Sequence, residues 1–301
     1  MDHKIIEHAQ VIVKNSTGDK VTIPRTEQSI MHARAGNREY RIYVAMPSGE
    51  PPSSGYPVIY LLDANAVFGT MVEAMRVQAR RTERTGVVPT IIVGIGYSTE
   101  DPFASARHYD FTLPVSVTEL PASPDGRAWP EQGGAEDFLT FIQEELKPEI
   151  ERRYTIDRGR QTLFGHSLGG LFVLHVLFTK PEAFQTYVAG SPSIHWNKRI
   201  MLKEERQFTV RLEEEPVNVR ILLGMGELEK FHKSRIYENA KELSNRLATL
   251  VNQGVCVEFK EFEDEGHVSL LPALISRALR FASRPSLISS EDVKVLHGSK
   301  I

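Results

Sequence analysis

The chain alternates short runs of consecutive apolar residues with stretches of helical periodicity, and this alternation restricts its fold more than any other feature. Such apolar runs are typical of strands in a parallel sheet that is covered on both faces. Six of them lie at residues 58–62, 90–95, 161–164, 185–189, 219–223 and 255–259. Strands that alternate with helices in this way predict a doubly wound α/β sheet, with ligand sites at the carboxyl ends of the strands.

The first third of the chain predicts an antiparallel hairpin at the edge of this sheet. Residues 22–34 form one long run, residues 35–37 supply a turn, and residues 40–45 alternate back. Helices are expected over 168–179 and 268–281, and where apolar residues recur every four positions, at Phe138, Ile142, Leu146 and Ile150 and at Leu243, Leu247 and Val251. Segment 110–134 is rich in Pro and Gly and shows neither period, which predicts a lid or binding loop.

The length and composition of the chain fit one α/β domain with a sizeable core. Of the 301 residues, 41% are apolar and 25% are charged. We expect the core to cover about residues 20–284 and a polar tail to cover 285–301. The formal net charge of −3 gives no electrostatic reason to expect a nucleic acid or an anionic membrane as a partner.

The same sequence favours a cytoplasmic location. Its first residues lack the apolar region of a signal peptide, and no run approaches the about eighteen apolar residues that would span a membrane. The single cysteine, Cys256, lies in an alternating run and is expected to be a buried core thiol. No residue pattern indicates a metal or another cofactor.

The strongest functional signal is the pattern G-x-S-x-G at Gly165, Ser167 and Gly169. An apolar strand precedes this pattern and a helix without proline follows it. In this context the serine occupies a tight, strained turn between strand and helix, because a Cβ at either glycine would collide with a neighbouring element. The turn presents the hydroxyl at the helix N-terminus, where developing negative charge is favoured. Ser167 is therefore predicted to be a catalytic nucleophile.

The general base follows by elimination, because α/β-hydrolases order their triad as serine, acid, histidine. The histidines after the nucleophile are His175, His195, His232, His267 and His297. The first lies inside the helix after the serine, the second precedes the strand that should carry the acid, and the third follows that strand too closely. The last lies in the polar tail. His267, between the last strand and the last helix, is where a base would be presented to the serine.

The acid is predicted to be a glutamate, because no aspartate occurs between Ser167 and Asp264. Glu227 and Glu229 both follow the strand at 219–223, which is the usual place for the acid. Glu229 is preferred because it lies three residues past a glycine, and Glu227 is the reserve. The alternative is a Ser–His dyad in which both glutamates are solvated.

Acyl transfer also needs two donors for the developing oxyanion. One is expected to be the backbone N–H of Leu168, directly after the nucleophile. The other is expected in the loop after the strand at 58–62, with Asn65 as the first candidate and Ala64 as the second. Asp63 is expected to brace this loop.

Four residues are candidates for binding the substrate. Arg80 and Arg84 continue a helical spacing that begins at Arg76, on a helix expected from about residue 67. Arg107 leads into the long loop, and Trp196 follows a strand end at the catalytic edge. Guanidinium groups bordering a pocket would favour an anionic substrate. The alternatives are a solvated helix face for the arginines and core packing for the tryptophan.

Five motifs occur in one order within residues 40–280: Tyr60-Leu-Leu-Asp63, Gly94-Ile-Gly-Tyr97, Gly165-His-Ser-Leu-Gly-Gly170, Ser191-Pro-Ser193 and Gly266-His267. This set resembles the branch of the α/β-hydrolases that includes esterase D and the ferric-siderophore esterases. It is particularly similar to the bacterial trilactone esterases that open ferric bacillibactin and enterobactin. Ala64 departs from the pattern, because the family more often has glycine after the aspartate.

The resemblance implies a serine carboxylic-ester hydrolase without a cofactor, whose small-molecule substrate is the trilactone ester of an anionic ferric catecholate siderophore. It also implies a serine and a histidine as catalytic residues, although some members lack a well-placed acid. The alternatives are a general carboxylesterase, a thioesterase similar to S-formylglutathione hydrolase, or an acyltransferase. A binding protein on an inactive hydrolase scaffold would be a non-enzymatic alternative.

Overall fold

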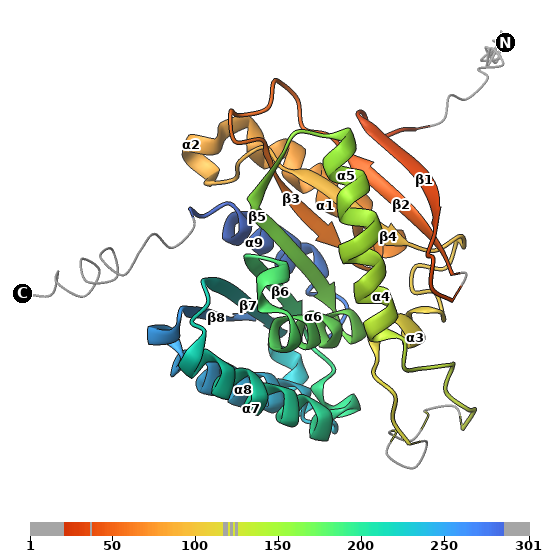
Figure 1. Cartoon of the computed structure of the whole chain (residues 1–301), viewed down its shortest axis with the longest axis vertical. Coiled ribbons are helices and arrows are strands. Elements are labelled where there is room, and N and C mark those ends of the chain that lie inside the picture. Colours follow the sequence, from red (N-terminus) through yellow and green to blue (C-terminus); the bar gives the residue numbers. More distant parts are fainter. Residues whose placement is uncertain (1–20, 37, 117–119, 121–122, 124–125, 286–301) are drawn as a thin grey trace, which may run out of the picture.

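The computed structural model of the chain describes residues 21–36, 38–116, 120, 123 and 126–285 (Figure 1). Within these residues, eight strands form one sheet in the order β1-β2-β4-β3-β5-β6-β7-β8. The strands are β1 (Thr26–His32), β2 (Glu39–Ala45), β3 (Tyr56–Leu61), β4 (Ile91–Gly96), β5 (Ile156–His166), β6 (Thr186–Gly190), β7 (Val219–Gly226) and β8 (Val255–Phe262). The pairs β1–β2 and β2–β4 are antiparallel and the others are parallel. The predicted parallel sheet with an antiparallel N-terminal hairpin is confirmed.

Helices cover both faces of this sheet, as a doubly wound fold requires (Figure 1). On one face α1 (Ala64–Gln78) packs beside α9 (Leu271–Ala282). The other face carries α4 (Ala135–Phe141), α5 (Lys147–Arg153), α6 (Leu168–Thr179), α7 (Lys198–Glu214) and α8 (Ile236–Ala248). Two short helices, α2 (Thr82–Thr85) and α3 (Arg107–Phe111), lie in connections. None of the helices in the described part of the chain is long and apolar enough to cross a bilayer.

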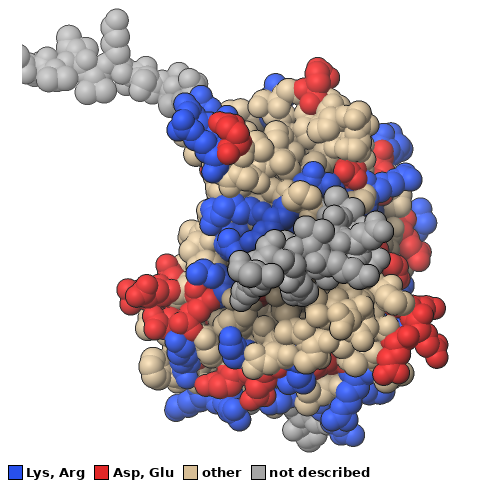
Figure 2. Space-filling view, turned by 90° about the vertical axis from the view of Figure 1, so that its left-hand side faces the viewer, with Lys and Arg blue, Asp and Glu red and all other residues tan. Residues whose placement is uncertain are grey.

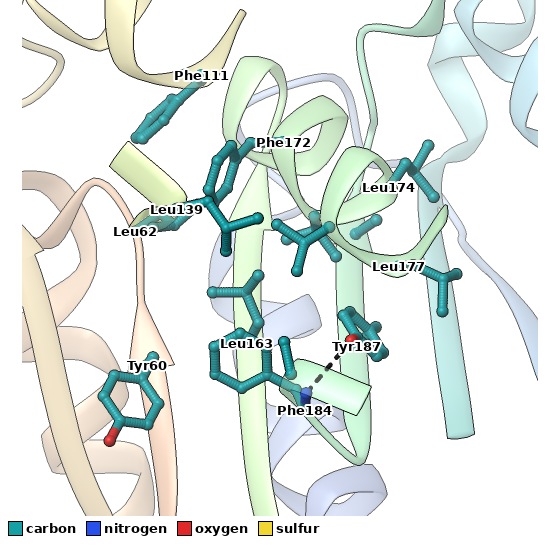
Figure 3. Packing of buried hydrophobic residues seen from close by; sticks show 14 of the residues in the cluster. Tyr60, Leu62, Phe111, Leu139, Leu163, Phe172, Leu174, Leu177, Phe184 and Tyr187 are labelled. Atoms are coloured by element: carbon teal, nitrogen blue, oxygen red, sulfur yellow. Dashed lines mark hydrogen bonds between the residues drawn. The ribbon is translucent and has the colours of Figure 1, made fainter. Parts of the chain in front are cut away.

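The buried apolar residues form one cluster on each side of the sheet. Neighbouring strand residues alternate between the two, because successive side chains of a strand point to opposite faces. In β3, Ile59 contributes to the cluster under α1 and α9, whereas Tyr60 contributes to the cluster under α6. Figure 3 shows the second cluster, where Phe172 of α6 lies over the sheet and Leu163 and Tyr187 come from β5 and β6.

The helix after the serine matches its predicted range, and three other expectations need correction. The helix after β3 begins at Ala64, before the expected residue 67. Val251 lies beyond the end of α8 and is 50% exposed, so it does not belong to the buried face of that helix. Cys256 is only partly buried in β8. The long helix α7 was not expected.

The segment predicted to be a lid or binding loop connects α3 to α4. Among its described residues, none between Phe111 and Gly134 belongs to a helix or a strand. Residues 117–119, 121–122 and 124–125 of this segment lie outside the described residues, as does most of the predicted tail at 286–301.

Candidate active site

A single residue, Ser167, makes the turn between β5 and α6, and its backbone adopts φ 59° and ψ −117°. Residues other than glycine rarely adopt this conformation, which costs about 1–3 kcal/mol. Gly165 allows the tight approach of strand and helix, because a Cβ there would lie 2.2 Å from the carbonyl oxygen of Gly169. A Cβ at Gly169 itself would meet no atom closer than 3.4 Å, so the collision predicted for that glycine does not occur.

The structure brings Ser167, His267 and Glu229 into one hydrogen-bonded chain. The Oγ atom of Ser167 lies 3.0 Å from Nε2 of His267, which stands on the connection from β8 to α9. The Nδ1 atom of the same imidazole lies 2.7 Å from Oε1 of Glu229. These distances allow a proton to pass from the hydroxyl to the imidazole while the carboxylate orients the ring.

Glu229 is held on the short helix η6 (Glu227–Phe231), directly after β7. Its Oε2 atom accepts hydrogen bonds from the backbone N–H of Gly226 at 2.7 Å and from the hydroxyl of Ser191 at 2.6 Å. Burial works to raise the pKa of Glu229, but the hydrogen bonds from His267, Ser191 and Gly226 hold it below its usual value. An ionised carboxylate can only accept, so Nδ1 of His267 carries the proton and Nε2 is left to accept from Ser167.

The reserve acid, Glu227, does not contact the imidazole. Its Oε2 atom instead accepts a hydrogen bond from the backbone N–H of Asp264 at 3.2 Å, and Oε1 lies 3.7 Å from Nζ of Lys230. Of the other histidines, His175 is buried in α6 beside Glu204, as expected from its position inside that helix. His297 lies outside the described residues.

His166, the residue before the nucleophile, supports the loop that carries the base. Its Nε2 atom donates a hydrogen bond of 2.6 Å to the carbonyl oxygen of His267, and the two rings lie 4.8 Å apart between centroids. Burial, together with the nearby His267, lowers the pKa of His166 to about 3. The ring is therefore neutral at neutral pH and keeps this donor role without adding a charge beside the imidazole.

The residues predicted to supply backbone donors for an oxyanion lie at two helix N-termini, where the first N–H groups of a helix have no partner within it. Leu168 is the first residue of α6, and Ala64 and Asn65 open α1. The side chain of Asn65 is fully engaged with the end of β4. It donates to the carbonyl oxygens of Tyr97 and Thr99 at 3.0 and 2.8 Å and accepts from the N–H of Tyr97 at 2.8 Å. This leaves the backbone of Asn65, and not its amide group, as a donor.

Arg107, one of the candidates for binding the substrate, braces this loop. The guanidinium donates to both carboxylate oxygens of Asp63 at 2.8 Å, and Asp63 precedes α1 with φ 52°. The same group donates to the carbonyl oxygen of His166 at 3.3 Å. Arg107 borders the cavity at Ser167, but its charge is already paired with a buried carboxylate. It therefore ties the start of α1 to the nucleophile turn, as expected of Asp63.

Arg80 and Arg84 do not belong to the site that contains Ser167. The 15 residues of α1 extend about 22 Å from its first residue near the nucleophile, at 1.5 Å per residue. Arg80 follows that helix in η1 (Ala79–Arg81) and Arg84 lies in α2, which Figure 1 shows at the opposite end of the sheet from α3. Both are exposed, and neither lines the catalytic cavity. Lysine and arginine side chains gather on part of the face seen in Figure 2, which is the left side of Figure 1 and carries α2.

The catalytic cavity, of about 260 Å³, opens directly onto the nucleophile. It is lined by Arg107, His108, Trp129, Ser167, Leu168, Ser193, His195, Trp196, His232, Ile236 and His267. Trp196 was predicted here. Trp129 and His108 were not named as site residues, although Trp129 lies in the segment predicted to be a lid or binding loop. The two indole rings lie edge to face at 4.6 Å between centroids, and His108 lies beside both. The cavity therefore has an aromatic wall.

Three further polar residues line the cavity and were not among the predicted site residues: Ser193, His195 and His232. The Oγ atom of Ser193 lies 3.3 Å from that of Ser167, and its position after β6 was the available signal. Burial, with nearby His232 and His267, lowers the pKa of His195 to about 4, so this ring is neutral at neutral pH.

Within the described residues, no three His, Cys, Asp or Glu side chains are placed to hold a metal ion. The arrangement thus offers a nucleophile, a base, an acid and neutral imidazoles.

Comparison with known proteins identifies the family. Residues 33–272 match the model of the esterase family described as "Putative esterase". The chain is 61% identical to the ferri-bacillibactin esterase BesA of Bacillus subtilis over 269 residues, which cover 89% of this chain and 93% of that one. It is 37% identical to a siderophore enterobactin esterase of Emericella nidulans, over 84% of this chain and 92% of the other. A crystal structure of the BES protein from Bacillus cereus, 44% identical, superposes with a TM-score of 0.83 over 90% of this chain and all of that one. The chain therefore belongs to this esterase family and is a serine ester hydrolase with the α/β-hydrolase fold.

Proposed function

We propose that this enzyme hydrolyses the trilactone esters of a ferric catecholate siderophore in the cytoplasm, with Ser167, His267 and Glu229 as its triad. The observation that carries the catalytic part is the pair of contacts at 3.0 and 2.7 Å that joins these three side chains. The substrate part is supported by the relatives named as siderophore esterases.

In the first step the Oγ atom of Ser167 attacks the ester carbonyl carbon while its proton passes to Nε2 of His267. Glu229 stabilises the imidazolium that forms, because its carboxylate stays ionised and bonded to Nδ1. The tetrahedral oxyanion accepts hydrogen bonds from the N–H of Leu168 and from the first turn of α1, at Asn65 or Ala64. The alkoxide then leaves as an alcohol with the proton from His267.

In the second step water replaces the alcohol. His267 takes a proton from the water, whose oxygen attacks the acyl carbon bonded to Ser167, and the second oxyanion uses the same donors. Return of the proton to Oγ frees a carboxylic acid. Repeating this cycle on the three esters of a trilactone yields linear catecholoyl-serine units. The opened chelate binds iron less tightly and lets the metal be released.

The decisive experiment compares the wild-type enzyme with Ser167→Ala on two substrates. A p-nitrophenyl ester should give a burst of nitrophenol and a covalent acyl adduct on Ser167 in the wild type. The variant should lose the adduct and about 10⁴-fold or more in kcat, because the other residues retain only binding and oxyanion stabilisation. An alanine variant with full activity would contradict the assignment of the nucleophile.

The substrate is tested by supplying a ferric trilactone and separating the products by liquid chromatography with mass detection. Linear catecholoyl-serine units are expected from the wild type and not from Ser167→Ala. Turnover of the p-nitrophenyl ester without cleavage of the trilactone would leave a serine esterase but reject the siderophore as its substrate.

A further inference from the structure

A second, larger cavity adjoins the catalytic one. It has a volume of about 1030 Å³ and shares His195 and Trp196 with the cavity at Ser167. Its wall runs from the short helix η5 (Ile194–Trp196) along the first half of α7, with Val115 from the connection between α3 and α4. The two cavities therefore adjoin each other at η5.

The α7 side of this cavity is basic. Arg199, Lys203 and Arg206 recur at i, i+4 and i+7, so they share one face of the helix, and all three are exposed and line the cavity. Lys198 lines it as well, with its Nζ atom bonded to Oδ1 of Asn239 at 2.7 Å. Lys203 and Arg206 form no ion pair with any residue that the structure describes. We refer to Arg199, Lys203 and Arg206 as the α7 basic face.

Two glutamates lie within the span of α7 that carries this face, and both are paired with other groups. Glu204 lies 3.1 Å from Nδ1 of His175, and Glu205 is bound by Arg246 at 2.5 and 2.8 Å on the buried side of the helix. No aspartate or glutamate is among the described residues that line the cavity. The cavity therefore combines positive charge on one side with the indole of Trp196 at its junction with the catalytic cavity.

The volumes of the two cavities, like the charge on α7, favour a ligand that extends from Ser167 into the second cavity. Pockets for drug-sized ligands measure about 300–1,000 Å³, and the catalytic cavity has only about 260 Å³. The catalytic cavity can therefore hold only the reacting part of a bulky ester that has several aromatic arms. The remaining arms need adjoining space, which the second cavity provides.

We propose that the cavity lined by the α7 basic face binds the non-reacting catecholate arms of a polyanionic ester while one ester bond reaches Ser167. This inference rests on the proposed function and names the residues that select its substrate. Guanidinium and ammonium groups attract catecholate oxygens, and Trp196 offers a ring surface where the arm enters the catalytic cavity. A small neutral ester occupies the catalytic cavity only and does not contact α7.

The test uses the intrinsic fluorescence of the full chain, because both of its tryptophans, Trp129 and Trp196, line the catalytic cavity. A ferric trilactone siderophore is titrated into Ser167→Ala, which cannot turn it over, and quenching gives the Kd. Adding Lys203→Glu and Arg206→Glu should raise the Kd by about tenfold or more and make it less dependent on salt.

The matched control in the same background is Arg80→Glu with Arg84→Glu, which changes the net charge equally at the end of the sheet opposite the catalytic site. This pair should change the Kd by less than about twofold, because a Debye length of about 10 Å screens distant charges. Equal weakening by both pairs would overturn the inference, since it would mean that only the overall charge of the protein matters.

Turnover separates this inference from the function on which it rests. With Ser167 intact, Lys203→Glu and Arg206→Glu should lower kcat/KM for the ferric trilactone and leave kcat/KM for p-nitrophenyl acetate unchanged. If the wild type cleaves the trilactone and the α7 variant does so equally well, the basic face has no role but the proposed function stands. If the wild type cleaves only the neutral ester, both the siderophore assignment and this inference are rejected.

Discussion

Glu229 is the residue on which the orientation of the base depends, because its two carboxylate oxygens accept hydrogen bonds from three separate donors. Two of these, Ser191 and the N–H of Gly226, fix the carboxylate to β6 and β7, and the third is the imidazole. Because the N–H of Gly226 and the Ser191 hydroxyl hold Oε2, only Oε1 is left to orient His267. These contacts favour the proposed triad over a Ser–His dyad.

We expect Glu229→Gln to lower kcat for a neutral ester by about 10²–10⁴-fold. The amide keeps the shape of the side chain but removes the charge that stabilises the imidazolium, and it can present an N–H to the wrong ring nitrogen. The measurement is steady-state kinetics with p-nitrophenyl acetate, with circular dichroism to show that the fold is retained.

Glu227→Gln is the control for this change, because that glutamate lies two residues away and contacts Asp264 instead of the imidazole. Its kcat should stay within about twofold of the wild type. Comparable losses in both variants would show that the carboxylate of Glu229 has no special part in the reaction.

The contact between Ser167, His267 and Glu229 could be predicted from the sequence, because the order of these residues along the chain follows the order of the strands. Each member follows a recognisable strand, and parallel strands bring their carboxyl ends to one edge. The aromatic wall could not be predicted in this way. Trp129 reaches Trp196 through a connection without helix or strand, so no periodicity in the sequence indicates that the two meet.

At the scale of secondary structure, the contact between β5 and α6 places the nucleophile. We expect Gly165→Ala to lower the free energy of unfolding by roughly 1–3 kcal/mol and to reduce activity, because the new Cβ would overlap backbone atoms of Gly169. Urea denaturation gives the first quantity and ester turnover the second.

Gly159→Ala on the same strand provides the comparison. Its Cβ would lie 3.3 Å from Oδ1 of Asp157, a side-chain atom that can move, at an exposed position. A change within about 0.5 kcal/mol is expected. If both substitutions destabilise the protein equally, the close approach at Gly165 is not what matters.

Two helical regions, α7 and the segment after α1, show where apolar or charged spacing does not predict the helix correctly. The buried face of α7 contains Met201, Glu205, Phe208 and Leu212, so a charged residue interrupts its apolar pattern. The partner that allows this burial, Arg246, comes 41 residues later. Arg80 and Arg84 show the reverse case, in which a helical spacing continues where the helix does not. The helix α1 ends at Gln78, and Arg81, with φ −140° and ψ 59°, leaves the helical conformation.

At the scale of the whole molecule, His175 joins three helices. It lies in α6, with Nδ1 3.1 Å from Glu204 of α7 and Nε2 3.3 Å from Glu136 of α4. Burial lowers the pKa of His175, but the two carboxylates raise it more, to about 9 from an ordinary value of 6.5. The folded protein therefore binds this proton more tightly than the unfolded chain does.

The sign of the pH dependence follows from this difference. The stabilisation is fully present below pH 6.5 and is lost as the pH rises through about 9. The shift corresponds to at most roughly 3 kcal/mol, less the screening by solvent at the exposed Glu136. We expect His175→Gln to flatten the fall in unfolding free energy across this window, as measured by urea denaturation at several pH values. Parallel curves for the two proteins would assign the pH dependence to other groups.

The distribution of the triad along the chain has a consequence for biosynthesis. The base lies after the edge strand β8, on the connection to α9. The helix α9 packs against α1, which lies between β3 and β4 in the chain. During synthesis, Ser167 leaves the ribosome 100 residues before His267. Until His267 is made, the nascent chain lacks the imidazole that contacts this serine. We therefore expect translation products that end before His267 to lack esterase activity, because they have no general base for Ser167.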